Sequence, residues 1–398
     1  MNSPLIEAFG KQFGAAPTHV VRAPGRVNLI GEHIDYHRLP VLPMAVDREI
    51  RMLCRGREDG TVRALTLAGH LPGASFELGT HIPSAGKGDW SNYVRGAAQS
   101  IVNHQGASRG VDLLVDSTLP LAAGLSSSSA LTVAAGLALA QVNGVLLDRH
   151  MFAEQMAEAE HYAGTRGGGM DQAVCLLARA GHALHVEFDP VAVRPVPLPA
   201  NLRVVVAHSL VSAEKSGRAG AAYNERRRIG EAALGSMVAA LGLPVGTGYA
   251  ELVSGGEDML RLAAETLSGS ALNYFRHVVG EARRVARAAV ALESSDLSAL
   301  GGLVDDSHES LRGDYDVSTP ELDQLVTSAR RGGALGARLT GAGFGGSAIA
   351  LVTAERTGDV TAALVSDFYE PRGIADPAAC DRLLVVRAMD GATVEVLP

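Results

Sequence analysis

The amino-acid sequence predicts an α+β fold divided between two domains. Segments with the two-residue period of strands and segments with the helical period both occur, but they do not alternate strictly as in a doubly wound fold. Helical patterns dominate beyond residue 201, whereas most expected strands precede it. A chain of 398 residues is also long for one compact core, which favours two domains.

Short apolar runs bounded by turn residues predict the strands of the first domain, and helical spacing predicts its helices. The expected strands are residues 19–21, 41–46, 50–55, 62–67, 74–78, 111–115 and 182–188. The expected helices are residues 5–13, 91–103, 130–142, 148–162 and 170–178. The helix at 130–142 carries no charged residue, so we expect it to be deeply buried.

A segment with four prolines and no clear period, residues 189–201, is the expected domain boundary. We therefore place the N-terminal domain at 1–195 and the C-terminal domain at 196–398. The helices expected beyond the boundary are 221–240, 272–292, 297–311 and 320–331. The strands expected there are 203–208, 337–340, 347–352 and 383–387.

The composition is that of an ordinary globular protein, with 47% hydrophobic and 20% charged residues. A net charge of -8 argues against a general binder of nucleic acids or membrane surfaces. The three cysteines lie far apart, without the spacing of a metal site or a disulfide framework. Neither a secretory signal nor a membrane-spanning run is visible, so a cytoplasmic protein is expected, as a monomer or a small homo-oligomer.

The most informative stretch is A-P-G-R-V-N-L-I-G-E-H-I-D-Y at residues 23–36, a dense polar cluster between apolar strands. Its polar side chains are Arg26, Asn28, Glu32, His33, Asp35 and Tyr36. Buried polar groups are costly unless they find partners. The cluster therefore either pairs internally or holds a polar ligand.

Two further stretches carry groups suited to phosphate chemistry. The run from Gly124 through Ser126, Ser127, Ser128 and Ser129 precedes the buried helix, and a helix N-terminus attracts anions. No lysine follows, so this is not the P-loop of nucleotide-binding proteins. Asp171 follows three glycines at a helix start, where the helix dipole favours the ionised carboxylate.

Four motifs in order resemble those of the galactokinases, a branch of the GHMP superfamily of small-molecule kinases. They are the 23–36 stretch, L-P-L-A-A-G-L-S-S-S-S-A-L at 119–131, G-G-G-M-D-Q at 167–172, and L-T-G-A-G-F-G-G-S at 339–347. The resemblance implies an N-terminal domain like domain 2 of ribosomal protein S5 and a ferredoxin-like C-terminal domain. The active site would lie between them.

The resemblance also implies roles for single residues at a sugar and a phosphoryl site. Asp171 matches the catalytic aspartate that faces the anomeric hydroxyl, and Arg26 matches its arginine partner. The residues implied to contact the sugar are Arg26, Glu32, His33, Asp35, Gly168, Asp171 and Tyr223.

ATP and Mg²⁺ are the implied nucleotide and metal. The loop of Gly124 and the four serines would hold the triphosphate, and Trp90 would stack on adenine. Ser128 and Glu160 would hold Mg²⁺ between phosphates. The glycine-rich run 340–346 would close over the site.

The choice of sugar stays open at this stage. Where most galactokinases have a polar residue and glycines after the tyrosine, this chain has H-R-L-P at 37–40, which puts bulk beside the sugar pocket. An N-acetylgalactosamine kinase or a heptose or octose 1-kinase would carry the same motifs. A non-catalytic sugar sensor is disfavoured because Asp171, Arg26 and the serine loop are all present, and a homoserine- or mevalonate-type kinase would lack the E-H-x-D-Y cluster.

Overall fold

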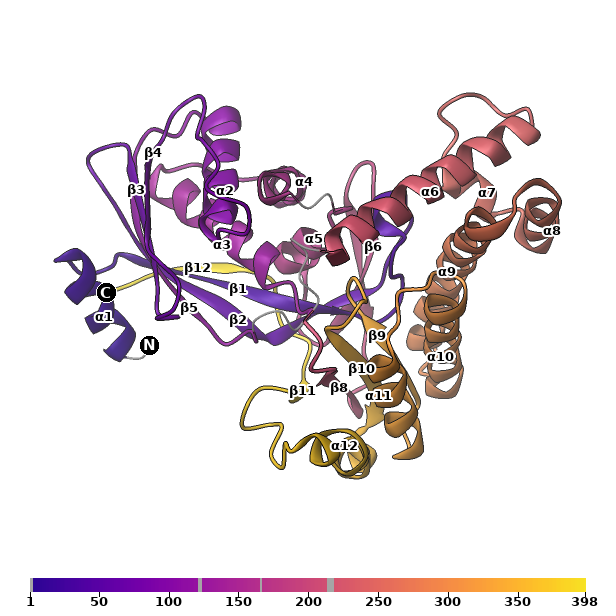
Figure 1. Ribbon diagram of the computed structural model, residues 1–398. Helices are drawn as coiled ribbons and strands as arrows, with labels where there is room; N and C mark the ends of the chain where they lie inside the picture. The colour runs from indigo at the N-terminus through magenta and orange to yellow at the C-terminus, as the bar shows by residue number, and fades with distance from the viewer. Residues whose placement is uncertain (1–2, 121–123, 165–166, 213–217) are drawn as a thin grey trace.

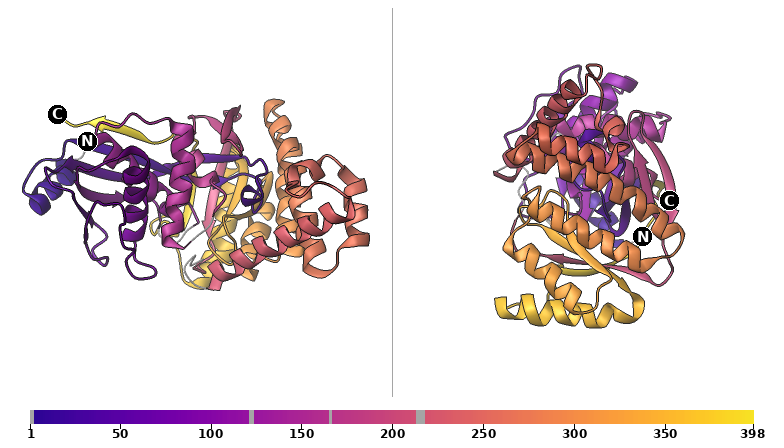
Figure 2. Two further views of the ribbon diagram at one scale, coloured as in Figure 1. Left: turned by 90° about the horizontal axis from the view of Figure 1, so that it is seen from above. Right: turned by 90° about the vertical axis from the view of Figure 1, so that its right-hand side faces the viewer.

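The computed structural model describes residues 3–120, 124–164, 167–212 and 218–398. It contains two main sheets and a separate hairpin, with helices packed around them (Figure 1). The first sheet lies at one end of the molecule together with both termini, and a group of helices between residues 218 and 293 lies at the other end (Figure 2).

The first sheet has six strands in the order β12-β1-β2-β5-β3-β4. These strands are β1 (His19–Asn28), β2 (Pro43–Gly56), β3 (Thr61–Thr66), β4 (Ala74–Glu77), β5 (Val111–Ser117) and β12 (Thr393–Val396). All neighbouring pairs are antiparallel except β3 and β5. The register of β1 on β2 shifts between Pro24 and Arg26, at the start of the polar stretch.

Four helices lie over one face of this sheet (Figure 1). They are α2 (Ser91–Gln105), α3 (Ser127–Val142), α4 (Arg149–Glu160) and α5 (Met170–Leu177). The uncharged helix α3 packs directly on β1 and β2 and is buried along most of its length, as its composition predicts. The opposite face is covered near its end by α1 (Ser3–Phe13), whose Leu5 and Phe9 pack on Val20, Leu53 and Leu114.

The second sheet is antiparallel, with strands in the order β11-β8-β10-β9. Its strands are β8 (Leu202–His208), β9 (Gly336–Thr340), β10 (Ser347–Thr353) and β11 (Leu383–Val386). Helices α10 (Leu297–Gly313), α11 (Pro320–Arg331) and α12 (Thr357–Leu364) pack against it. Mixed sheets and helices in this arrangement confirm the predicted α+β class.

The remaining helices extend away from the second sheet (Figure 1). They are α6 (Arg218–Ala240), α7 (Tyr249–Val253), α8 (Gly256–Thr266) and α9 (Gly269–Glu293). The long helix α9 packs on α6, α7, α8 and α10. Within the described parts of the chain, none of the helices is both long and apolar enough to cross a membrane.

Several element predictions were wrong in detail. Residues 41–46 and 50–55 do not form two strands, because β2 runs without interruption through the charged residues between them. The proline-rich segment contains β7 (Ala192–Pro197), which forms a hairpin with β6 (His182–Glu187). The short helices α7, α8 and α12 and the strand β12 were not predicted. Strand β12 pairs with β1, so the chain returns to the first sheet after the second is complete.

Candidate active site

A cavity of about 240 Å³ lies where the N-termini of α3 and α5 meet the 29–34 loop, α6 and the β9–β10 loop. Both halves of the chain contribute to its wall. Most of the site residues expected from the sequence line it. They are Arg26, Glu32, His33, Asp35, Gly124, Ser126, Ser127, Ser128, Glu160, Gly168, Asp171 and Tyr223. The four motifs, which are spread over more than 300 residues of sequence, therefore converge on one cavity.

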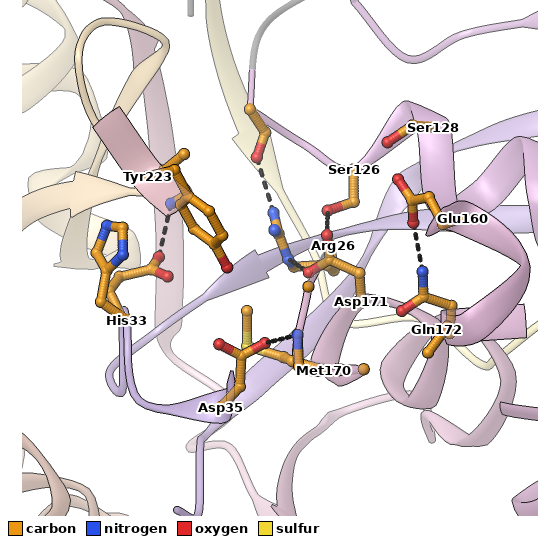
Figure 3. A pocket seen from close by; sticks show the side chains of 18 of the residues that line it. Arg26, His33, Asp35, Ser126, Ser128, Glu160, Met170, Asp171, Gln172 and Tyr223 are labelled. Carbon is orange, nitrogen blue, oxygen red and sulfur yellow. Dashed lines mark hydrogen bonds and ion pairs between the residues drawn. The ribbon is translucent and has the colours of Figure 1, made fainter. Parts of the chain in front are cut away.

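Asp171 stands in the first turn of α5 with both carboxylate oxygens engaged (Figure 3). Arg26 Nε donates to Oδ1 over 2.7 Å, and the Ser126 hydroxyl donates to Oδ2 over 2.6 Å. The Arg26 side chain is only 5% exposed, and its Nη1 also donates to the Gly124 carbonyl. A charge-assisted pair held this way fixes the orientation of the carboxylate.

Asp35 presents a second carboxylate to the same cavity from the short 3₁₀ helix η1 (Asp35–His37). The Gly168 backbone N–H donates to its Oδ2 over 3.1 Å. Burial, and next the charge of Asp171, raise the pKa of Asp35 to about 6. A Cβ on Gly168 would lie 2.3 Å from the Asp35 carbonyl carbon, so only glycine fits there.

Aromatic rings form another part of the wall. The ring of His33 lies 5.5 Å from that of Tyr223, which projects from α6, and its Nδ1 is 3.0 Å from the Tyr36 hydroxyl. Burial lowers the pKa of His33 to about 3, so the imidazole is neutral at physiological pH. A neutral histidine and a tyrosine hydroxyl offer uncharged hydrogen-bonding groups suited to sugar hydroxyls.

Glu32 lines the cavity, but one of its oxygens is already held from the second half of the chain. Its Oε1 accepts hydrogen bonds from the Gly341 N–H over 2.6 Å and the Thr340 hydroxyl over 3.1 Å. The fully buried Arg338 guanidinium lies 3.0 Å from the same oxygen. Sequence reasoning missed Arg338, because an arginine in an apolar strand pattern gives no signal of what it faces.

The serine loop forms the N-terminus of α3 beside these carboxylates. Ser126 occupies the N-cap position with a positive φ of 58°; its side chain makes no capping bond, and its hydroxyl donates to Asp171. The first-turn N–H groups of Ser127 and Ser128 are therefore not capped by that hydroxyl. Such an uncapped helix N-terminus is suited to phosphate oxygens.

Glu160 ends α4 with one oxygen bonded and the other without a hydrogen-bond partner among the described residues. Its Oε2 accepts from the Ser129 hydroxyl over 2.7 Å and from the Gln172 amide (Figure 3). Ser129 is fully buried and does not line the cavity, whereas Ser128 does. No cluster of three or more His, Cys, Asp or Glu suited to a metal occurs in the described residues.

Trp90 does not line this cavity. It sits at the N-cap of α2, packs against the core and donates its indole N–H to the Pro72 carbonyl over 2.9 Å. Tyr93, one turn along the same helix, does line the cavity. Stacking of Trp90 on adenine therefore remains a prediction.

The segment 37–40 lies outside the cavity wall. His37 does not line the cavity and packs edge-on against Tyr249, 4.8 Å between ring centres. Its ring also lies against the backbone of Gly230 on α6. The His37 ring therefore fills the space between η1 and the helices α6 and α7, while the exposed Arg38 pairs with Asp189.

Fold and site together define a small-molecule kinase of the GHMP class. Residues 92–179 match the family model of the GHMP kinase N-terminal domain, and residues 288–370 match that of the C-terminal domain. A mevalonate kinase from Leishmania major shares the fold with a TM-score of 0.60 at 19% identity, covering 93% of this chain and 95% of that one.

Within this class, residues 7–56 match the galactokinase galactose-binding signature. A galactokinase from Chloroflexus aggregans is 40% identical over 92% of both chains, and one from Roseiflexus is 36% identical over 97% of this chain and 95% of its own. The crystal structure of Lactococcus lactis galactokinase complexed with galactose superposes with a TM-score of 0.88 at 28% identity, covering 98% and 99% of the two chains. The chain belongs to the galactokinase family.

Proposed function

We propose that this kinase transfers the γ-phosphoryl group of ATP to the anomeric hydroxyl of galactose, giving galactose 1-phosphate and ADP. The observation that carries the proposal is the Asp171 carboxylate, held by Arg26 and Ser126 at a cavity that Asp35 enters from the signature stretch. Curated relatives over nearly the whole chain are galactokinases, which favours galactose over the larger or longer sugars.

In the reaction, the anomeric oxygen forms a bond to the γ-phosphorus as the bond from that phosphorus to the β–γ bridging oxygen breaks. Asp171 accepts the proton that the hydroxyl loses, and Arg26 holds Asp171 in place and offsets negative charge on the transferred group. The N-terminus of α3 holds phosphate oxygens. His33, Asp35, Gly168 and Tyr223 hold the sugar, with Glu32 at the edge of the same wall.

The residues near Glu160 fit a magnesium ion. Its Oε1 is buried without a hydrogen-bond partner in the described structure, and the Ser128 hydroxyl lines the same cavity. Mg²⁺ takes few protein ligands and keeps several waters, so a single carboxylate and a hydroxyl suffice beside phosphate oxygens. When bound, the ion would offset charge on the phosphates.

A coupled assay of ADP release tests the proposal across galactose, N-acetylgalactosamine, glucose and longer sugars. We expect galactose to give the highest kcat/KM. Asp171→Asn should bind ATP normally but lose turnover by about 10²–10⁴-fold, because an amide cannot accept the proton. If none of these sugars is turned over, the proposal is overturned. Unchanged turnover in the Asp171 variant would remove that residue from its role.

A further inference from the structure

Two side chains of α9 that do not line the cavity hold the backbone of the sugar signature. His277 and Glu281 lie four residues apart, one above the other on one face of the helix. Both are fully buried. Glu281 also lies 3.6 Å from Arg338 of β9, and neither residue belongs to any of the four motifs.

Glu281 accepts hydrogen bonds from the tip of the signature loop. Its Oε1 accepts from the Gly31 N–H over 2.8 Å and from the Glu32 N–H over 3.3 Å, while the Ser307 hydroxyl donates to it over 2.7 Å. Arg284 donates to the other oxygen over 2.8 Å. Although burial opposes ionisation, the charge of Arg284 lowers the pKa of Glu281, so it accepts these bonds as a carboxylate.

His277 holds the next carbonyl of the same loop. Its Nε2 lies 3.0 Å from the Glu32 carbonyl oxygen and its Nδ1 lies 3.0 Å from the Ser310 hydroxyl. Burial lowers the pKa of His277 to about 4, so the ring is neutral and carries one proton. Because a carbonyl oxygen only accepts, a bond to Glu32 places that proton on Nε2, and the one proton of the Ser310 hydroxyl is then shared between Nδ1 and Asp314 Oδ2.

The two contacts fix both the N–H and the C=O of one residue. Glu32 is thus held by Glu281 and His277 through its backbone and by Arg338, Thr340 and Gly341 through its side chain. The next residue, His33, has a positive φ of 63° and lines the cavity. The positions of the His33 ring and the Asp35 carboxylate therefore depend on how the Glu32 backbone is held.

We infer that His277 and Glu281 are positioning residues for sugar recognition, acting from α9 through the backbone of Gly31 and Glu32. The inference rests on the proposed function. It assigns control of sugar affinity to a helix of the second half of the chain. Since neither side chain reaches the serine loop or Asp171, ATP affinity should not depend on them.

The test compares Glu281→Gln and His277→Phe with the unchanged chain. We expect the KM for galactose to rise about tenfold in each, as for loss of a buried hydrogen bond to a charged or polar group. The KM for ATP should stay within about twofold, because the loss concerns only sugar binding. His277→Gln keeps an N–H donor and should recover part of the sugar affinity.

The control for a merely structural role is Tyr369→Phe. The buried Tyr369 hydroxyl lies 2.7 Å from the Arg382 carbonyl and 2.9 Å from the His208 carbonyl, and its one proton is shared between them; neither group belongs to the signature. That variant should lower the melting temperature without changing either KM. If Glu281→Gln fails to fold, Ser307→Ala, which removes one donor to the same oxygen, should raise the sugar KM in the same direction by less.

The outcomes separate the inference from the proposed function. Unchanged sugar KM in the α9 variants, or equal rises in the KM values for sugar and ATP, would overturn the inference while leaving galactose phosphorylation intact. A wild-type chain that neither binds nor phosphorylates galactose would overturn the proposed function, and the inference with it.

Discussion

Ser126 has a role at the residue scale beyond that of a phosphate ligand. It adopts a left-handed backbone conformation that a non-glycine residue rarely takes, and in doing so it directs its hydroxyl to Asp171. The backbone strain is confined to Ser126. As a result, the Asp171 carboxylate is held at one oxygen by Ser126 and at the other by Arg26. The same side chain makes no capping bond to α3, which leaves the first-turn N–H groups of the helix available to an anion.

Replacing Ser126 with alanine should therefore slow the chemical step more than it weakens binding. We expect kcat to fall about tenfold or more, the usual loss for a hydrogen bond to a charged group, with the KM for galactose little changed. Steady-state kinetics in both substrates measure this. Ser127→Ala is the matched control, because Ser127 lines the cavity without bonding Asp171 in the described structure; equal losses of kcat in both variants would contradict the positioning of Asp171 by Ser126.

Asp35 should give sugar binding a pH dependence near pH 6. Burial raises its pKa to about 6, and a protonated carboxyl accepts hydrogen bonds from sugar hydroxyls less well. The KM for galactose should rise as the pH falls through 6, measured between pH 5 and 8. Asp35→Asn should bind galactose weakly at every pH in this range, and a variant that retains the wild-type profile would assign the ionisation elsewhere.

The raised pKa of Asp35 also makes the free energy of unfolding depend on pH. The folded chain holds a proton on Asp35 between the unfolded pKa of 3.8 and about 6, so its ionisation becomes a cost to folding as the pH rises through that window. Asp35→Asn removes this cost. The variant should therefore be relatively more stable above pH 6 than below pH 4, by denaturant unfolding at both values.

At the element scale, the turn that precedes α5 is set by a close backbone approach. Gly168 lies against the peptide joining Asp35 and Tyr36, where an added Cβ would come within 2.3 Å of backbone atoms. Gly167, its neighbour, faces open space. The two adjacent glycines therefore differ in what they tolerate.

Gly168→Ala should separate η1 from the start of α5 and move Asp35 away from Asp171. We expect galactose binding to be lost, with turnover reduced at least 100-fold, a loss typical of misplaced reacting groups. Gly167→Ala should behave like the unchanged chain. Binding calorimetry with galactose, together with a check of folding by circular dichroism, distinguishes the two, and equal activity in both variants would show that the close approach is not required.

The elements that the sequence predicted well are those with a helical pattern over many residues, a uniformly apolar composition or a clear start signal. Helix α3 has apolar residues all round, and α11 begins with threonine and proline, so burial of the first and the start of the second could be predicted. The continuity of β2 through Asp47–Glu49 could not be predicted, because three consecutive charged residues resemble a turn although they lie half-buried within the strand. In β7 the prolines are tolerated because the hairpin has a free edge.

At the scale of the whole molecule, the cavity exists only because distant segments meet. The motifs indicated Arg26, Asp35 and Asp171 because each lies in a local pattern of unusual composition. Arg338, His277 and Glu281 had no such pattern, since their partners are some 240–310 residues away along the chain. Long-range pairing of ordinary residues is the part of the site that sequence periodicity does not encode.

This convergence predicts that galactose stabilises the two halves together. Residues 23–36 lie on the first sheet and beyond it, yet Glu32 is bonded to Thr340, Gly341 and Arg338 of the second. A ligand bound on this junction at about 100 times its Kd adds about 2.7 kcal/mol to the free energy of unfolding. In calorimetry the whole transition should move up by a few degrees, whereas the same concentration of sorbitol controls for the general effect of polyols. If the halves unfolded in two resolved steps and galactose moved only one of them, the buried bonds of Glu32 would not couple the sheets.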